Sequence, residues 1–264
     1  MARYGLSRRL AAAGVLVPVG VLLAAAPPGA GGAGGAFRVT PARLGAEVPI
    51  EQQLGGSIWA VALAGVTAYV GVGPRVAALD VTDPGEPRVV AWSRPLPALV
   101  TALAVQDDFV YAAAGDVMVL GARGEKPLAV VGRARLEVTQ YGSFGPFLPE
   151  AIAVDGDRAF VVGPSGLQAV DVSDPTAPVP LWSVAVWGVD LSARGGYVFV
   201  AVGGGMDGPV SPRVLVVDGG GDGRVVAQVD EVSSAWALAL VGDTLLVSDA
   251  GCNLRPIDIS EPAA

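Results

Sequence analysis

Leu167–Pro175 reads LQAVDVSDP and Val76–Pro84 reads VAALDVTDP, so the same apolar run, Asp and turn occur twice. The Asp side chain can accept backbone N–H bonds from the turn, while Pro presets φ at its first corner. Two weaker copies follow, and Val117–Leu120 fills the slot without its Asp. A carboxylate that recurs once per unit is better explained as a turn cap than as an acid or metal ligand. The predicted structural turn caps are Asp80, Asp171, Asp218 and Asp258.

Two further short runs precede each of these strands. One contains a bulky residue among small β-formers, as in Ala68–Gly71, and the other alternates Ala with larger apolar residues, as in Trp59–Leu63. Gly or Asp residues separate the two runs, which is typical of β-hairpins. A fourth run follows the turn, as in Arg88–Trp92. The bulky residues recur at Tyr69, Tyr111, Phe160, Phe199 and Leu246.

Four short strands in each unit of about 40–50 residues are the pattern of a β-propeller blade. We therefore predict an all-β fold, an approximately five-bladed β-propeller with four-stranded blades. The units at Val76–Pro84 and Leu167–Pro175 resemble the LVIVD repeat, and the resemblance covers roughly residues 40–264. It implies an exported or surface-attached bacterial propeller, a group mostly without an assigned reaction.

The last unit ends after its Asp turn and lacks a fourth strand. Residues 40–48 have the turn Pro and the apolar pattern of the fourth strands elsewhere. We expect an N-terminal strand near residues 43–48 to complete the last blade, because closing the ring removes two exposed edges. The alternative is that the chain is a fragment of a longer propeller.

The first residues predict export. Arg3, Arg8 and Arg9 precede the uncharged run Leu10–Ala26, and small residues follow, which is the order of a signal peptide. We divide the chain into a signal peptide with a small-residue linker (1–36) and a propeller domain (37–264). The expected location is secreted, periplasmic or cell-surface. The alternative is an uncleaved membrane anchor, although the apolar run is shorter than the roughly 20 residues of a spanning helix.

The amino-acid composition excludes several kinds of catalytic site. The chain has no His and one Cys, which excludes His-dependent triads, His-ligated metals and multi-thiolate sites. Its net charge is −8, and −11 without the three Arg of residues 1–36, so nucleic acid is not an expected partner. We predict no catalytic residues, no cofactor and no metal site.

A binding site is predicted where the first strands begin, because first strands that line a central channel would gather these residues at one mouth. Aromatic faces beside a carboxylate suit a sugar, a peptide or a cation. The alternative is that the indoles pack between blades. We expect a non-catalytic binding or scaffold module for a protein or glycan at the cell envelope. The competing hypothesis is a calcium-type, lactonase-like hydrolase that uses Glu150 and Asp190. The candidate ligand-binding residues are Trp59, Glu150, Trp187 and Trp236.

Overall fold

The computed structural model describes residues 56–137, 148–202, 213–230, 232, 234–251 and 253–262. Its regular elements are 19 β-strands, which form five antiparallel sheets. No helix within these ranges has the length and apolarity needed to cross a membrane. The prediction of an all-β fold built from blade-like units is therefore confirmed.

Each sheet follows the order of the chain. The first sheet contains β1 (Ile58–Ala64), β2 (Thr67–Val72), β3 (Arg75–Asp80) and β4 (Arg88–Trp92). The second contains β5 (Ala102–Gln106), β6 (Phe109–Ala114), β7 (Asp116–Gly121) and β8 (Val130–Ala134). The third contains β9 (Ala151–Asp155), β10 (Arg158–Gly163), β11 (Gly166–Asp171) and β12 (Val179–Val184). The fourth contains β13 (Gly188–Arg194), β14 (Tyr197–Val202), β15 (Arg213–Asp218) and β16 (Val225–Val229). The fifth contains β17 (Ala235–Val241), β18 (Thr244–Asp249) and β19 (Leu254–Asp258).

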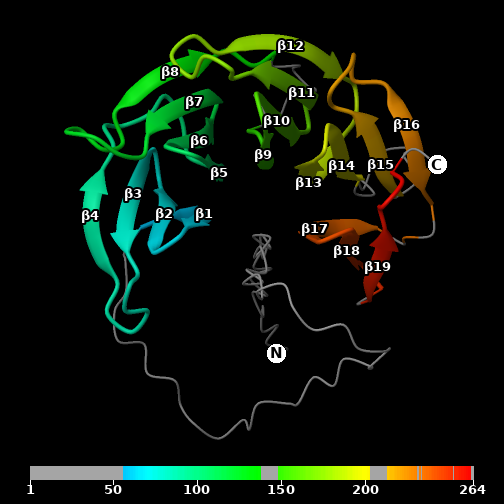
Figure 1. Ribbon diagram of the computed structural model, residues 1–264, viewed down its shortest axis with the longest axis horizontal. Helices are drawn as coiled ribbons and strands as arrows, with labels where there is room; N and C mark the ends of the chain where they lie inside the picture. Colours follow the sequence, from blue (N-terminus) through cyan, green and yellow to red (C-terminus); the bar gives the residue numbers. More distant parts are fainter. Residues whose placement is uncertain are drawn as a thin grey trace, which may run out of the picture.

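The five sheets stand like blades along an arc around a common centre (Figure 1). The first strand of each blade lies innermost, and β4, β8, β12 and β16 lie on the outside. Each first strand neighbours the first strand of the next blade, from β1 through β5, β9 and β13 to β17. In the described part of the chain the fifth blade has three strands, and the predicted closing strand near residues 43–48 lies outside that part.

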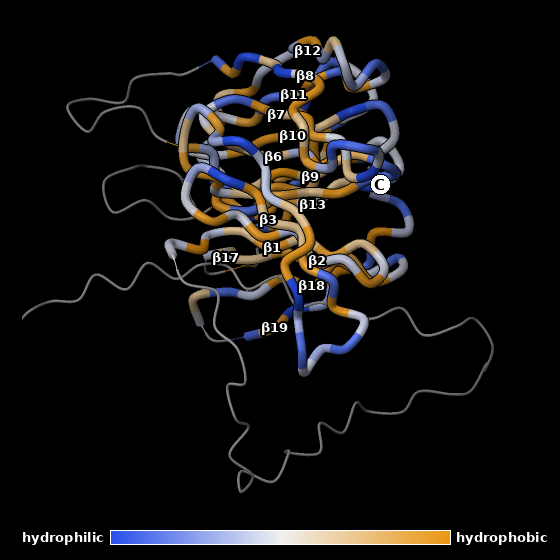
Figure 2. Tube along the Cα trace, turned by 90° about the vertical axis from the view of Figure 1, so that its left-hand side faces the viewer, coloured by the Kyte–Doolittle hydropathy of each residue, from blue (hydrophilic) through white to orange (hydrophobic). Residues whose placement is uncertain are grey.

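The core lies between the blades. In the first four blades the bulky residue of the second strand packs against the following blade, as Tyr69 packs with Val110 and Met118, and Phe160 with Leu191 and Val200. Figure 2 shows the result, with hydrophobic positions along the stacked strands and hydrophilic positions mostly in the turns. Blades of this kind bury both faces of a sheet, which explains why their strands are so rich in Val, Leu and Ala.

Strand pairing fixes the register of the units. Tyr69 pairs with Ala78, Tyr111 with Val119 and Phe160 with Ala169, which makes these positions equivalent. The same register places Gly121 in the slot of Asp80 and Asp171, because Phe109 pairs with Gly121 as Arg158 pairs with Asp171. The sequence alignment that put Leu120 in this slot was therefore wrong by one residue.

Candidate functional site

The predicted ligand-binding residues lie at or just before the starts of inner strands. Glu150 precedes β9, Trp187 precedes β13 and Trp236 lies in β17, so these three belong to consecutive blades whose first strands adjoin. Trp59 lies in β1, and β5 separates that strand from β9. The structure thus groups three of the four residues and sets Trp59 apart from them. We call Glu150, Trp187, Trp236 and Asp190 the inner-mouth site.

A β-bulge distinguishes the positions of the tryptophans. The pairing skips one residue between Ile58 and Ala60, between Ala235 and Ala237, and between Gly188 and Asp190. The skipped residue is Trp59 in the first blade, Trp236 in the fifth and Val189 in the fourth. Trp187 therefore lies two residues before the position of the other two, a shift that spacing in the sequence did not reveal.

This shift places Asp190 where the other bulged strands have Ala60 and Ala237. Its Oδ1 accepts the N–H of Leu191 at 2.9 Å, and its Oδ2 accepts the N–H of Leu238 at 2.7 Å. Because Leu238 belongs to β17, the second bond joins the inner strands of the fourth and fifth blades. Burial raises the pKa of Asp190 to about 6, against the lowering effect of the two backbone hydrogen bonds.

Glu150 is the second carboxyl group of the inner-mouth site. The residue as a whole is exposed, yet its surroundings desolvate the carboxyl group enough to raise its pKa to about 7. The charge of Asp190 adds to this increase. The two groups therefore sense each other electrostatically across β9 and β13, and near neutral pH the site can hold a proton as well as negative charge.

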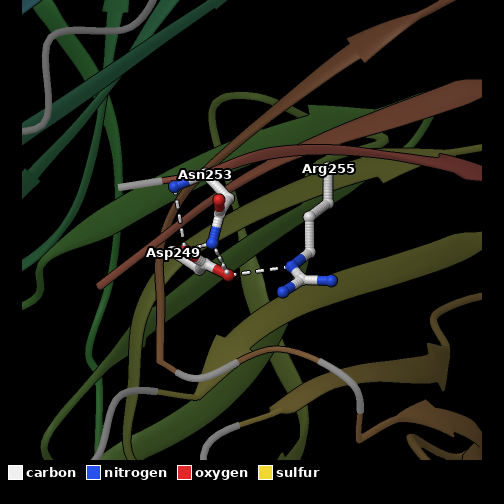
Figure 3. A network of polar contacts seen from close by, with 3 residues as sticks. All are labelled: Asp249, Asn253 and Arg255. Carbon is white, nitrogen blue, oxygen red and sulfur yellow. Dashed lines mark hydrogen bonds and ion pairs between the residues drawn. The ribbon is translucent and has the colours of Figure 1, made fainter. Parts of the chain in front are cut away.

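A polar network of Asp249, Asn253 and Arg255 was not foreseen from the sequence (Figure 3). Asp249, which pairs with Ala235, accepts the Nε–H of Arg255 at 2.8 Å and the backbone N–H of Asn253 at 3.1 Å. Arg255, followed by the backbone and side chain of Asn253, lowers the pKa of Asp249 to about 2. The carboxylate is covered by these neighbours, although the network lies near the surface. It fixes the turn between β18 and β19.

The recurring carboxylates all lie at the ends of third strands and accept backbone N–H groups of the following turn. The acceptor–donor pairs are Asp80 with Thr82 (2.9 Å), Asp171 with Ser173 (2.8 Å), Asp218 with Gly221 (2.8 Å) and Asp258 with Ser260 (2.9 Å). Hydrogen bonds from the side chain and backbone of Thr82 lower the pKa of Asp80, and Ser173 and Ser260 act likewise on Asp171 and Asp258. Among the described residues, no group of three or more His, Cys, Asp and Glu side chains is arranged to hold a metal ion.

Comparison with known proteins identifies one unit. Residues 150–186 match the family model of the LVIVD repeat, which spans the whole third blade, from β9 to β12. The predicted resemblance is confirmed there. A solved structure of the computationally designed Ika8 protein is similar, with a TM-score of 0.48 and 13% identity over 78% of this chain and 72% of that chain. No curated protein matches the sequence.

Proposed function

We propose that this chain is an exported, non-catalytic propeller that binds a protein or glycan at the cell envelope through the inner-mouth site. The observation that carries the proposal is the exposure of two tryptophans at the starts of neighbouring inner strands, 42% for Trp187 just before β13 and 53% for Trp236 in β17. Exposed indoles beside carboxyl groups at a ring centre are the chemistry of a binding surface. The LVIVD repeat and the blade-like sheets support the propeller scaffold on which such a surface is built.

Core packing accounts for Trp182, whereas Trp187 and Trp236 keep much of their surface exposed. Trp182 in β12 stacks near Phe160, with ring centroids 6.0 Å apart, and joins the core between the third and fourth blades. Trp187 and Trp236 belong to none of the four core clusters of the described part. Exposure of this much aromatic surface to water is unfavourable, and a bound ligand would cover it.

The carboxyl groups narrow the chemistry of the ligand. Sugar hydroxyls can donate hydrogen bonds to Glu150 while the sugar ring stacks on an indole, and a cationic peptide side chain can pair with the same groups. An anionic ligand would meet repulsion from Glu150 and Asp190 and from a chain of net charge −8. We therefore favour neutral glycans or basic peptides.

The proposed scaffold is a five-bladed ring that residues 43–48 close by pairing with β19. In four of the blades the third strand pairs with a fourth, whereas β19 has no such partner among the described strands. Between the first two blades, β4 ends at Trp92 and β5 begins at Ala102. A linker of the same length before β1, which begins at Ile58, would follow a strand ending at Val48. The other three linkers of this kind have 16, 3 and 5 residues, so a linker of 9 residues lies within the range of the chain and is compatible with closure by the N-terminal strand.

The binding proposal is tested with purified peptidoglycan sacculi in a pelleting assay and with soluble oligosaccharides and basic peptides in fluorescence titrations. The double variant Trp187→Ala/Trp236→Ala should bind its ligand at least about tenfold more weakly, because central aromatic residues dominate binding energy. Trp92→Ala is the matched control, since Trp92 is 44% exposed but lies on the outer strand β4.

Equal binding by the double variant and the parent protein would overturn the role of the inner-mouth site. A calcium titration of thermal stability tests the competing hydrolase hypothesis in the same preparation. Stoichiometric calcium with a large increase in Tm would favour that hypothesis over the non-catalytic one.

A further inference from the structure

A cavity of about 220 Å³ lies between the first and second blades, at the opposite end of the hairpins from Trp59. Thr67, Tyr69 and Ala91 line it from the first blade, and Asp107, Ala122 and Arg123 line it from the second. For comparison, an engineered apolar cavity of roughly 150 Å³ is large enough to bind benzene. The space is therefore large enough for a small ring compound.

The cavity arises from small residues at three repeat positions. The register makes Thr67 equivalent to Phe109, Arg158 and Tyr197, each of which begins the second strand of its blade. Phe109 packs into the core of the second interface and Tyr197 into that of the fourth, and at the third interface Arg158 donates to the carbonyl of Gly219 in the following blade. Thr67 is too short to cross the first interface in the same way.

The other two positions in the first interface also have small side chains. Ala91 pairs with Ala78 as Trp182 pairs with Ala169, so an alanine replaces the indole that fills the third interface. The N–H of Ala122 donates to the backbone carbonyl oxygen of Asp108, as that of Val172 does to Asp157, so Ala122 and Val172 are equivalent. Val172 packs in the core of the second interface. Gly132 and Ala227 are also small at the position of Ala91, and Gly220 is small at the position of Ala122. Each of the other three interfaces nevertheless has larger residues at two of the three positions, whereas the first interface has none, and this combination leaves the volume open.

The walls combine apolar surface with a few polar groups. Tyr69 is buried, and desolvation raises the pKa of its hydroxyl group against the opposing effect of Arg123. Arg123 pairs with Asp108 at 3.2 Å, and Asp107 also lines the cavity. A carboxylate ligand would be attracted by Arg123 but repelled by Asp107 and Asp108, and an ammonium ligand would be attracted by the two aspartates but repelled by Arg123. Either charged group would also lose hydration against the apolar wall. A neutral ligand avoids both penalties.

We propose that the cavity between the first and second blades binds a small uncharged molecule with an apolar ring and a hydroxyl group. The ring occupies the space beside Ala91 and Ala122, and the hydroxyl group exchanges hydrogen bonds with Tyr69 and the charged groups at the rim. The site is separate from the inner-mouth site, and it stands whether or not that site binds a protein or glycan.

The test uses benzyl alcohol, benzoate and benzylamine as probes in calorimetry and ligand-detected NMR. Benzyl alcohol should bind saturably, and the two charged probes should bind at least about tenfold more weakly. Thr67→Phe, which copies Phe109, should abolish binding of benzyl alcohol. Thr244→Phe is the matched control, because Thr244 occupies the same repeat position in the fifth blade, away from the cavity.

Ala122→Val, which copies Val172, is a smaller filling change for the case in which Thr67→Phe does not fold. Loss of binding in either folded filling variant, with binding kept in Thr244→Phe, supports the site. Saturable binding that survives both filling variants, or the absence of saturable binding in the parent protein, overturns it. Tighter binding of benzoate or benzylamine than of benzyl alcohol overturns the uncharged class of ligand.

Discussion

The two carboxyl groups of the inner-mouth site make stability depend on pH in an unusual direction. The pKa of Glu150 rises from 4.5 to about 7 and that of Asp190 from 3.8 to about 6 on folding. The native state therefore holds protons that the unfolded state releases, and the free energy of unfolding should fall as pH rises from about 4 to about 7. Asp249 acts oppositely, since its pKa falls to about 2 and its contribution is lost below pH 3.8.

Glu150→Gln should remove much of this decrease between pH 4.5 and 7, because the amide carries no charge at either pH. Urea unfolding at several pH values measures the effect. Glu125→Gln is the matched control, because Glu125 is exposed and lies in the loop before β8, away from the inner mouth. An equal flattening of the pH profile in both variants would contradict a specific role for Glu150.

At the scale of the element, the outer strand of the second blade depends on a glycine. A Cβ atom added to Gly132 in β8 would collide with the carbonyl oxygen of Pro175 in the turn of the third blade. Gly132→Ala should therefore lower the free energy of unfolding by about 1–3 kcal/mol, the usual cost of overpacking. Chemical denaturation measures this loss.

Gly121→Ala is the control for that experiment, because the nearest atom to its added Cβ is 3.7 Å away, at ordinary contact distance. Equal stability of Gly132→Ala and Gly121→Ala would show that the two blades are not packed this closely. The sequence does not show which of the two glycines is tightly packed, since the neighbour of Gly132 comes from another unit.

Hairpins were the most predictable elements. Gly156 and Gly242 take positive φ angles of 58° and 56° at the turns between first and second strands, as hairpin chemistry requires. The repeat positions of Gly121 and Val189 were less predictable. Val189 lies in a bulge and Gly121 in a degenerate unit, and each shifts the register without changing the local composition. Strand existence thus followed from local pattern, whereas strand register required the pairing itself.

At the scale of the whole molecule, the first and fifth blades present faces without a covering blade. Val61 on β1 is 62% exposed and Leu254 on β19 is 67% exposed. The equivalent of Val61 in the second blade, Leu103, packs against the core beside the first blade. Closure of the ring would cover such surface, and the N-terminal strand would hold the two ends together.

Replacing residues 43–48 by a Gly-Ser segment of equal length should detach this strand, because the segment has no apolar side chains to bury and a low strand propensity. The stability should fall by about 4 kcal/mol, the sum of several lost backbone hydrogen bonds at about 1 kcal/mol each. This corresponds to a decrease in Tm of roughly 8–16 °C in scanning calorimetry. The same replacement of residues 37–42 is the control. Equal Tm values for the two replacements, or a concentration-dependent dimer in the parent protein, would contradict closure within one chain.

The sequence by itself determined the repeating unit, because strand alternation, turn residues and the Asp–Pro turn are encoded within short segments. It also indicated Trp187, Trp236 and Glu150 as candidates, since each stands near the start of a first strand. Only the tertiary structure decided which of these lie on adjoining strands, that Asp190 bonds to Leu238, and that Thr67, Ala91 and Ala122 leave a cavity. These features are contacts between different strands and blades, and their partners depend on register and on the stacking of blades, which no local pattern specifies.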